Sequence, residues 1–143
     1  MTQQPTYDDA NLILRLYEMR REERMRKARA WFTANCKVKS YDELLKLAPS
    51  GTDENASVRM VTSYWDLVAS FMTAGVLNKE LFFQSGRELL LVWERVRHYL
   101  PSMRDAYQDP SYLKHLEIMG TEFADHFKKQ DPNAYDAFLK RVK

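Results

Sequence analysis

Apolar residues recur every three or four positions between Val58 and Leu100, which is the spacing of one face of an α-helix. They form two stripes separated by a short polar interruption. The first stripe is Val61, Trp65, Val68 and Met72, and the second is Phe82, Gly86, Leu89, Trp93, Val96 and Leu100. Gly75 and Asn78 lie between them and are typical of a helix C-terminus and an N-cap. Because short connections make helices antiparallel neighbours, we predict a central helix hairpin over residues 58–75 and 79–100.

Two local contacts are predicted within this hairpin. Val76 is placed to fold back onto Phe71, a contact that often accompanies a glycine cap. Gly86 lies inside the second stripe, where a glycine costs roughly 1 kcal/mol relative to alanine. We expect Gly86 to make room for the indole of Trp65.

The same periodicity predicts a long first helix, because Asp8 or Asp9 is a suitable N-cap and apolar residues then recur as far as Cys36. Residues 1–7 are expected to be disordered. The Ser40-x-x-Glu43 capping box predicts a short helix. The Asp-Pro pairs at 109–110 and 131–132 are typical N-cap and N1 residues, and they predict a helix over residues 110–129 and a final helix.

These elements define an all-α fold, with no run of period two to indicate a strand. We predict one domain over residues 1–143, a helical bundle in which the long N-terminal helix and the 110–129 helix cover the central hairpin. The length of 143 residues and the 45% hydrophobic content agree with one globular core.

Composition adds a prediction of compartment. Cys36 is the single cysteine, which excludes an internal disulfide and is typical of a reducing compartment. The first residues lack a signal-peptide pattern, and no apolar run approaches the ~20 residues of a membrane helix. We therefore expect a cytoplasmic protein. The net charge of +2 is too small to indicate nucleic acid by itself.

Glu94 and His98 are four residues apart, as are Glu122 and His126, and such residues hold metals in some helical bundles. The di-iron spacing is three rather than four, and we expect Glu94 and His98 to face solvent. Surface pairs that support their helices are the favoured interpretation. No phosphate loop, nucleophile elbow or zinc motif is present. We predict no catalytic residue, cofactor or metal ligand, and a metal-dependent helical enzyme is the third-ranked hypothesis.

Basic residues are frequent between Arg15 and Arg29, where they outnumber the acidic ones. The candidate contacts for an anionic partner, either nucleic acid or an acidic membrane surface, are Arg20, Arg21, Arg24 and Lys27. A solvated helix with favourable i,i+4 ion pairs explains the same pattern and is the favoured interpretation. Anion binding is therefore the second functional hypothesis.

Leu91 lies opposite the apolar stripe of its own helix. The charged residues that frame it are Arg87, Glu88, Glu94 and Arg95. An apolar side chain within a polar ring is typical of an anchor at a protein–protein contact. A single exposed leucine and a leucine covered by the first or last helix are the alternatives. The leading hypothesis is a non-enzymatic interaction or structural module that acts through protein partners or self-association as a homodimer.

A family resemblance rests on the core and turn residues of the same region. The matching residues are Tyr64-Trp65-Asp66, Gly75-Val76-Leu77, Trp93, Leu100-Pro101, Arg104 and Tyr112. Over roughly residues 58–125 the chain resembles a bacterial family known as domain of unknown function 4760. The family pattern has glutamate where this chain has Asp66, and aspartate where it has Asn78. The resemblance implies a helical architecture and supplies no activity or catalytic residues.

Overall fold

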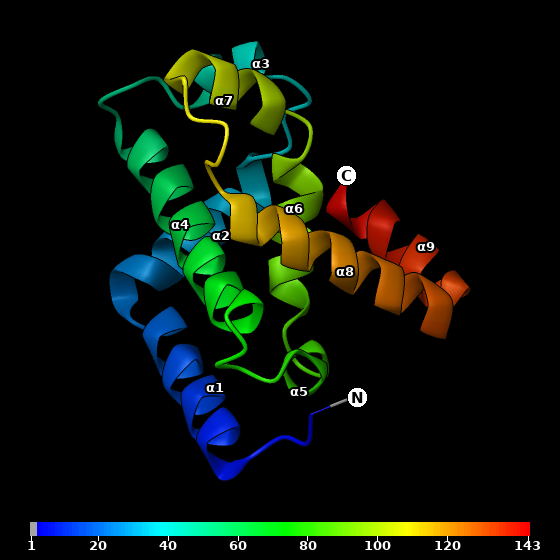
Figure 1. Cartoon of the computed structure of the whole chain (residues 1–143). Helices are drawn as coiled ribbons and strands as arrows, with labels where there is room; N and C mark the ends of the chain where they lie inside the picture. Colours follow the sequence, from blue (N-terminus) through cyan, green and yellow to red (C-terminus); the bar gives the residue numbers. More distant parts are fainter. Residues whose placement is uncertain (1–2) are drawn as a thin grey trace.

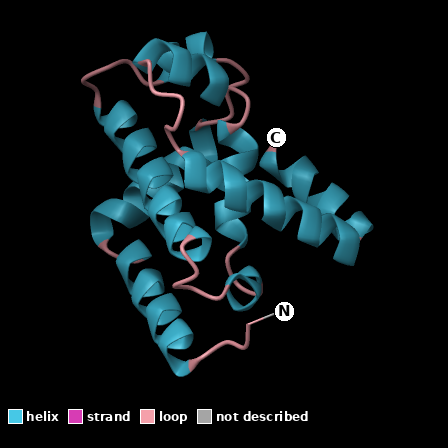
Figure 2. Cartoon of the chain, viewed as in Figure 1, coloured by secondary structure: helices cyan, strands magenta, loops and turns pink. Residues whose placement is uncertain are grey.

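The computed structural model describes residues 3–143, and this part of the chain forms nine α-helices and no strand (Figures 1 and 2). The helices are α1 (Tyr7–Arg20), α2 (Glu23–Asn35), α3 (Tyr41–Leu47), α4 (Asp53–Thr73), α5 (Lys79–Phe83), α6 (Arg87–Val96), α7 (Leu100–Tyr107), α8 (Lys114–Gln130) and α9 (Pro132–Val142). The predicted all-α, single-domain fold is confirmed. Among the described residues, none of these helices has both the length and the hydropathy to span a bilayer.

The core is built around α4, which packs mainly against α8 and α2 and also against α6 (Figure 1). Its buried face includes Val61, Trp65 and Val68, which are at most 1% exposed, as the apolar stripe predicts. In turn, α8 packs against α6 and α9. By contrast, α1 lies at the edge of the molecule, away from α8 and α9 (Figure 1).

The start of α1 is fixed by Thr6 rather than by Asp8 or Asp9 as predicted. The Thr6 hydroxyl accepts a hydrogen bond from the Asp9 N–H, and the Asp9 carboxylate accepts one from the Thr6 N–H at 2.7 Å. The second Asp9 oxygen accepts a hydrogen bond from the Asn78 N–H at 2.8 Å. The hydrogen bonds from Thr6 and Asn78 lower the pKa of Asp9. Of the residues predicted to be disordered, Tyr7 lies in α1 and 1–2 lie outside the described residues.

The predicted long first helix is divided in two, because the chain turns at Arg21 and Glu22. The Glu22 carboxylate accepts hydrogen bonds from the N–H groups of Arg24 and Met25, at 3.1 and 3.2 Å, and thereby caps α2. Arg29 donates a hydrogen bond to the Arg20 carbonyl oxygen at the end of α1. Both helix ends at the break therefore find partners.

The second half of the predicted hairpin is likewise divided, into α5 and α6. Gly75 has φ +77° and Asn78 caps α5 through its side chain, so both predicted roles are confirmed. The Val76 N–H donates a hydrogen bond to the Phe71 carbonyl oxygen at 2.9 Å, but the Val76 side chain, predicted to fold onto Phe71, is 62% exposed. The next residue, Leu77, is 2% exposed, and its N–H donates to the Phe71 carbonyl oxygen.

Two glycines allow close approach of aromatic rings. Gly86 is the N-cap of α6, and a Cβ there would lie 2.2 Å from a ring atom of Phe82. The ring that needs this space is therefore that of Phe82. The prediction that Gly86 makes room for Trp65 is wrong. A glycine of α8, Gly120, makes room for an indole instead: its Cβ would lie 2.3 Å from Cγ of Trp93. Gly120 thus sets how closely α8 crosses α6.

The two Asp-Pro pairs behave differently. Asp131 caps α9 as predicted, since its carboxylate accepts a hydrogen bond from the Ala134 N–H. Asp109 instead accepts one from the Ser111 N–H, which stabilises a turn, and α8 begins only at Lys114. The first turn of α8 is capped from a distance, because Asp66 of α4 accepts a hydrogen bond from the Leu116 N–H at 2.9 Å.

Candidate binding surfaces around α1

A groove of about 280 Å³ lies where α1 crosses α4, α5 and the start of α6. Most of its wall is apolar. The contributing side chains include Ile13, Leu14, Tyr17, Tyr64, Trp65 and Phe82. A concave, mostly apolar site with few polar groups is the usual form of a small-molecule site. The groove is therefore the first candidate functional site.

Trp65 forms a rigid part of this wall. Its side chain is 1% exposed, and its indole Nε1 donates a hydrogen bond to Glu88 Oε2 at 3.2 Å. The ring of Tyr64 meets it edge-on, with 4.9 Å between the centroids. The Tyr64 hydroxyl donates to the Leu16 carbonyl oxygen of α1, and burial raises the pKa of Tyr64 to about 12. The Tyr64–Leu16 bond holds α1 against α4, and the Trp65–Glu88 bond joins α4 to α6.

The carboxylate of Glu88 is balanced by Arg29. The guanidinium of Arg29 forms two parallel hydrogen bonds to it, Nε to Oε2 at 2.6 Å and Nη2 to Oε1 at 2.7 Å. This fork geometry is the strongest form of the arginine–carboxylate pair. The hydrogen bond to Glu88 raises the pKa of Arg29. Neither charge of this pair is therefore left uncompensated beside the groove.

Arg20 is the charged side chain of the groove. Its guanidinium carbon lies 4.9 Å from the ring centroid of Tyr17 and 5.3 Å from that of Trp65. Both distances fall within the range of cation–π attraction. Within residues 3–143 Arg20 forms no ion pair. Its charge is thus positioned by aromatic rings, with no anionic partner in the described part of the chain.

The other candidates for anion contact are more dispersed. Arg21 lies over the Tyr17 ring at 5.6 Å, and Arg24 is exposed on α2. Lys27 forms an exposed i,i+4 ion pair with Glu23 at 3.0 Å. Of the four predicted residues the structure brings only Arg20 to the groove. Sequence analysis missed both aromatic partners of Arg20. Tyr17 is three residues away on the same helix and could have been found from this spacing, whereas Trp65 is 45 residues away on another helix.

A second candidate surface involves the outer face of α4. Met19 of α1 and Met60 and Leu67 of α4 are 46%, 38% and 44% exposed, and they line one depression of about 540 Å³. We call these three residues the methionine surface. Tyr64 lines both this depression and the groove. The sequence carried one signal for this surface, since Met60 and Leu67 are seven residues apart and so share a helix face.

The surroundings of Leu91 differ from the prediction. Leu91 is partly buried and packs against the core, whereas Glu94 and Arg95 are only 6% and 4% exposed. The expectation that Glu94 faces solvent is therefore wrong. Arg87 is exposed and lies over the ring of Phe127 at 4.3 Å. The role of Leu91 in a partner contact stays a prediction, but buried Glu94 and Arg95 do not provide an exposed ring around it.

Arg95 is a buried cation held by carbonyl oxygens. Its guanidinium donates to the carbonyl oxygens of Phe32, Thr33 and Val142 at 3.0, 2.7 and 3.0 Å. These carbonyls lie in the last turns of α2 and α9, where the helix dipole favours a cation. Burial lowers the pKa of Arg95. Arg95 therefore joins two helix ends to α6 and has a structural role.

Glu94 is also held inside the protein. Its carboxylate accepts a hydrogen bond from the Tyr135 hydroxyl at 3.2 Å and pairs with Arg97 at 3.3 Å. Glu122, of the second Glu–His pair in the sequence, forms an ion pair with Lys79 at 2.9 Å. Within residues 3–143 no three His, Cys, Asp or Glu side chains are grouped as metal ligands.

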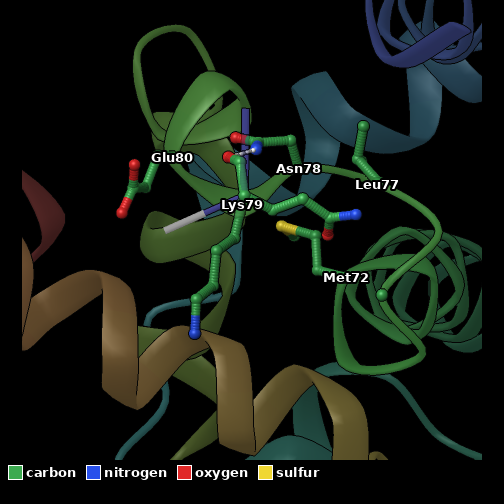
Figure 3. A pocket seen from close by; sticks show the side chains of 7 residues that line it. Met72, Leu77, Asn78, Lys79 and Glu80 are labelled. Atoms are coloured by element: carbon green, nitrogen blue, oxygen red, sulfur yellow. Dashed lines mark hydrogen bonds between the residues drawn. The ribbon is translucent and has the colours of Figure 1, made fainter. Parts of the chain in front are cut away.

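A cavity of about 470 Å³ lies beside the connection between α4 and α5 (Figure 3). Two of its polar residues, Asn78 and Lys79, are engaged in structural contacts. The Asn78 side chain caps α5 and donates to the Gln3 carbonyl oxygen at 2.8 Å. Lys79 extends toward α8, where it pairs with Glu122 (Figure 3). The acidic residue Glu80 also lines this cavity, so it is a less suitable site for an anion than the groove at Arg20.

Cys36 is the single cysteine of the chain, and Lys37 follows it in the sequence. Its side chain is fully buried, and burial raises the pKa of the thiol to about 12, although nearby Arg95 opposes this shift. A thiol with so high a pKa is a poor nucleophile. Cys36 is therefore a core residue.

Taken together, the fold and its surfaces define a helical domain with an aromatic–arginine groove and an adjoining exposed apolar surface. Residues 5–123 match the family described as Domain of unknown function (DUF4760), and the chain belongs to this family. The predicted resemblance is confirmed, and the match also includes α1 and α2. No curated protein and no solved structure shows significant similarity to the chain.

Proposed function

We propose that this domain is a non-enzymatic interaction module that associates with a second copy of itself through the methionine surface. The observation that supports the proposal is the exposure of three large apolar side chains, Met19, Met60 and Leu67, around one depression. Contiguous exposed apolar surface commonly marks an interaction site. Methionine side chains are flexible, so they adapt readily to a partner surface.

The chemistry of this surface favours a second copy as the partner. In a twofold dimer the same patch meets itself, so the Met60 and Leu67 side chains of one copy can enter the depression of the other. Glu22 is the charged residue that lines the depression, and its carboxylate is already hydrogen-bonded to the N-terminus of α2. These hydrogen bonds and the dipole of α2 stabilise the Glu22 charge at the edge of the surface. The net charge of +2 adds little repulsion between copies.

Cys36 supports a cytoplasmic setting for this module. It is a free, fully buried thiol. Proteins of reducing compartments commonly retain such thiols. The patch is small compared with the ~800 Å² per partner of a standard interface, so we expect a dimer that dissociates on dilution.

Light scattering after size exclusion, over a series of protein concentrations, tests this proposal. We expect the wild-type mass to rise toward that of a dimer with concentration, and Leu67→Asp to remain monomeric. Leu45→Asp is the matched control, because Leu45 is a similarly exposed leucine on α3. A wild-type monomer at every concentration, or equal effects of the two substitutions, would contradict the proposal. Dissociation by Leu91→Ala but not by Leu67→Asp would favour the predicted Leu91 contact instead.

A further inference from the structure

We infer that the groove beside Arg20 binds a small organic anion with an apolar body, of the class of medium-chain carboxylates. This site adjoins the methionine surface and shares Tyr64 with it, but the inference does not depend on self-association. It rests on the shape of the groove, the nature of its wall and the position of a single cation.

The apolar part of the ligand is indicated by the wall and the volume. Side chains of Ile13, Leu14 and Phe82 line the groove together with the indole of Trp65. The volume of about 280 Å³ corresponds to roughly nine or ten groups of water size, at ~30 Å³ each. A saturated chain of about eight carbons with a carboxylate has this size.

The anionic part is indicated by Arg20. The rings of Tyr17 and Trp65 lie near its guanidinium, at 4.9 and 5.3 Å, and hold it at the groove. Arg29 does not compete for a ligand, because Glu88 engages it through two hydrogen bonds. Among the residues that line the groove there is no carboxylate. An entering anion therefore meets one uncompensated positive charge beside an apolar wall.

A small anion fits this arrangement better than a polyanion does. Nucleic acids and acidic membranes are bound by several cations that share one surface. Of the four predicted anion contacts, Lys27 is paired with Glu23, and Arg20 alone lines the groove. One guanidinium at an apolar cavity is suited to one carboxylate with a short chain.

Octanoate is a suitable probe, with octanol as the uncharged control of the same chain length. We would titrate each into the ¹⁵N-labelled full-length protein and follow the three tryptophan indole N–H signals, assigned with Trp65→Phe and Trp31→Phe. The Trp65 indole N–H donates to Glu88 next to the groove, whereas Trp93 packs against Gly120 of α8. The expected result is a saturable shift of the Trp65 signal by octanoate, with Trp93 unchanged.

The contribution of the Arg20 charge is tested with Arg20→Gln. The matched control is Arg21→Gln, because Arg21 lies over the same Tyr17 ring but does not line the groove. We expect Arg20→Gln to weaken octanoate binding by about tenfold and Arg21→Gln by less than about twofold. Octanol should bind Arg20→Gln and the wild type alike, which shows that the groove itself is intact. Thermal melting of both variants checks that they fold.

Three results would overturn the inference. The first is the absence of a saturable Trp65 shift with octanoate. The second is an equal loss of affinity in the Arg20→Gln and Arg21→Gln variants, which would mean that only general charge matters. The third is equal affinity of the wild type for octanol and octanoate, which would remove the anion from the proposal. None of these results bears on the oligomeric state, so the two proposals fail separately.

Discussion

The close crossing of α8 over α6 makes Gly120→Ala the sharpest test of the packing. The new Cβ would lie 2.3 Å from Trp93 Cγ and 2.6 Å from Trp93 Cβ, where ordinary contacts are 3.4–4 Å. Because these Trp93 atoms are close to its backbone, rotation of the indole cannot relieve the clash, and the helices must separate by about 1 Å. A gap of this size forfeits a quarter to a half of the local dispersion energy.

Overpacking of this kind costs about 1–3 kcal/mol, whereas replacement of a helical glycine by alanine gains up to ~1 kcal/mol. We therefore expect Gly120→Ala to lower the free energy of unfolding by about 1–2 kcal/mol, which corresponds to roughly 3–7 °C in Tm for a domain of this size. Urea denaturation followed by circular dichroism measures this directly. Thr121→Ala, at an exposed position of the same helix, should change stability by less than about 0.5 kcal/mol. A Gly120→Ala protein as stable as the wild type would refute the reasoning.

Three further predictions concern buried groups. Arg95→Leu should lower the free energy of unfolding by about 3 kcal/mol in urea titrations, since it leaves the carbonyl oxygens at the ends of α2 and α9 without donors; an effect below 1 kcal/mol would contradict this. Asp9 has a pKa below its ordinary 3.8, so its charged form stabilises the fold above that pH and the contribution is lost as the pH falls through the lowered value. The stability difference between the wild type and Asp9→Asn should therefore shrink on acidification, and a constant difference would argue against the hydrogen bonds from Thr6 and Asn78. Cys36 should resist alkylation in the native protein at pH 8 and react on unfolding, as mass spectrometry can show, because its pKa is raised to about 12.

Local chemistry allowed several helix ends to be predicted from the sequence. Gly75, Asn78 and Asp131 act within three or four residues of their own positions, so their roles follow from short-range geometry. The buried face of α4 could also be predicted from the sequence, because its apolar residues recur with the period of a helix.

The breaks in the long helices could not be predicted in the same way. At Arg21 and Glu22 the sequence retains good helix formers, and the turn is stabilised by Arg29 and by the packing of α2 on α4. Similarly, the N-terminus of α8 depends on Asp66, which is 50 residues from its hydrogen-bond partner. Such tertiary contacts override propensity and leave no periodic signal.

The candidate sites show the same limit. Arg20 could be selected as a basic residue, but its position at a groove depends on Tyr17 and on Trp65 of another helix. From the sequence alone Arg95 would be assigned to the surface, because its partners are backbone carbonyl oxygens more than 40 residues away. Backbone acceptors carry no sequence signature, so burial of this cation could not be predicted.

The central claim, that the methionine surface joins two copies, is tested most directly by NMR of methyl-labelled methionine at increasing protein concentration. Met19 and Met60 lie on this surface, whereas Met103 and Met119 are buried elsewhere and serve as internal controls. The account predicts that the methyl signals of Met19 and Met60 shift with concentration while those of Met103 and Met119 stay fixed, and that Leu67→Asp abolishes the shifts. Concentration-independent signals for Met19 and Met60, up to the solubility limit, would contradict it.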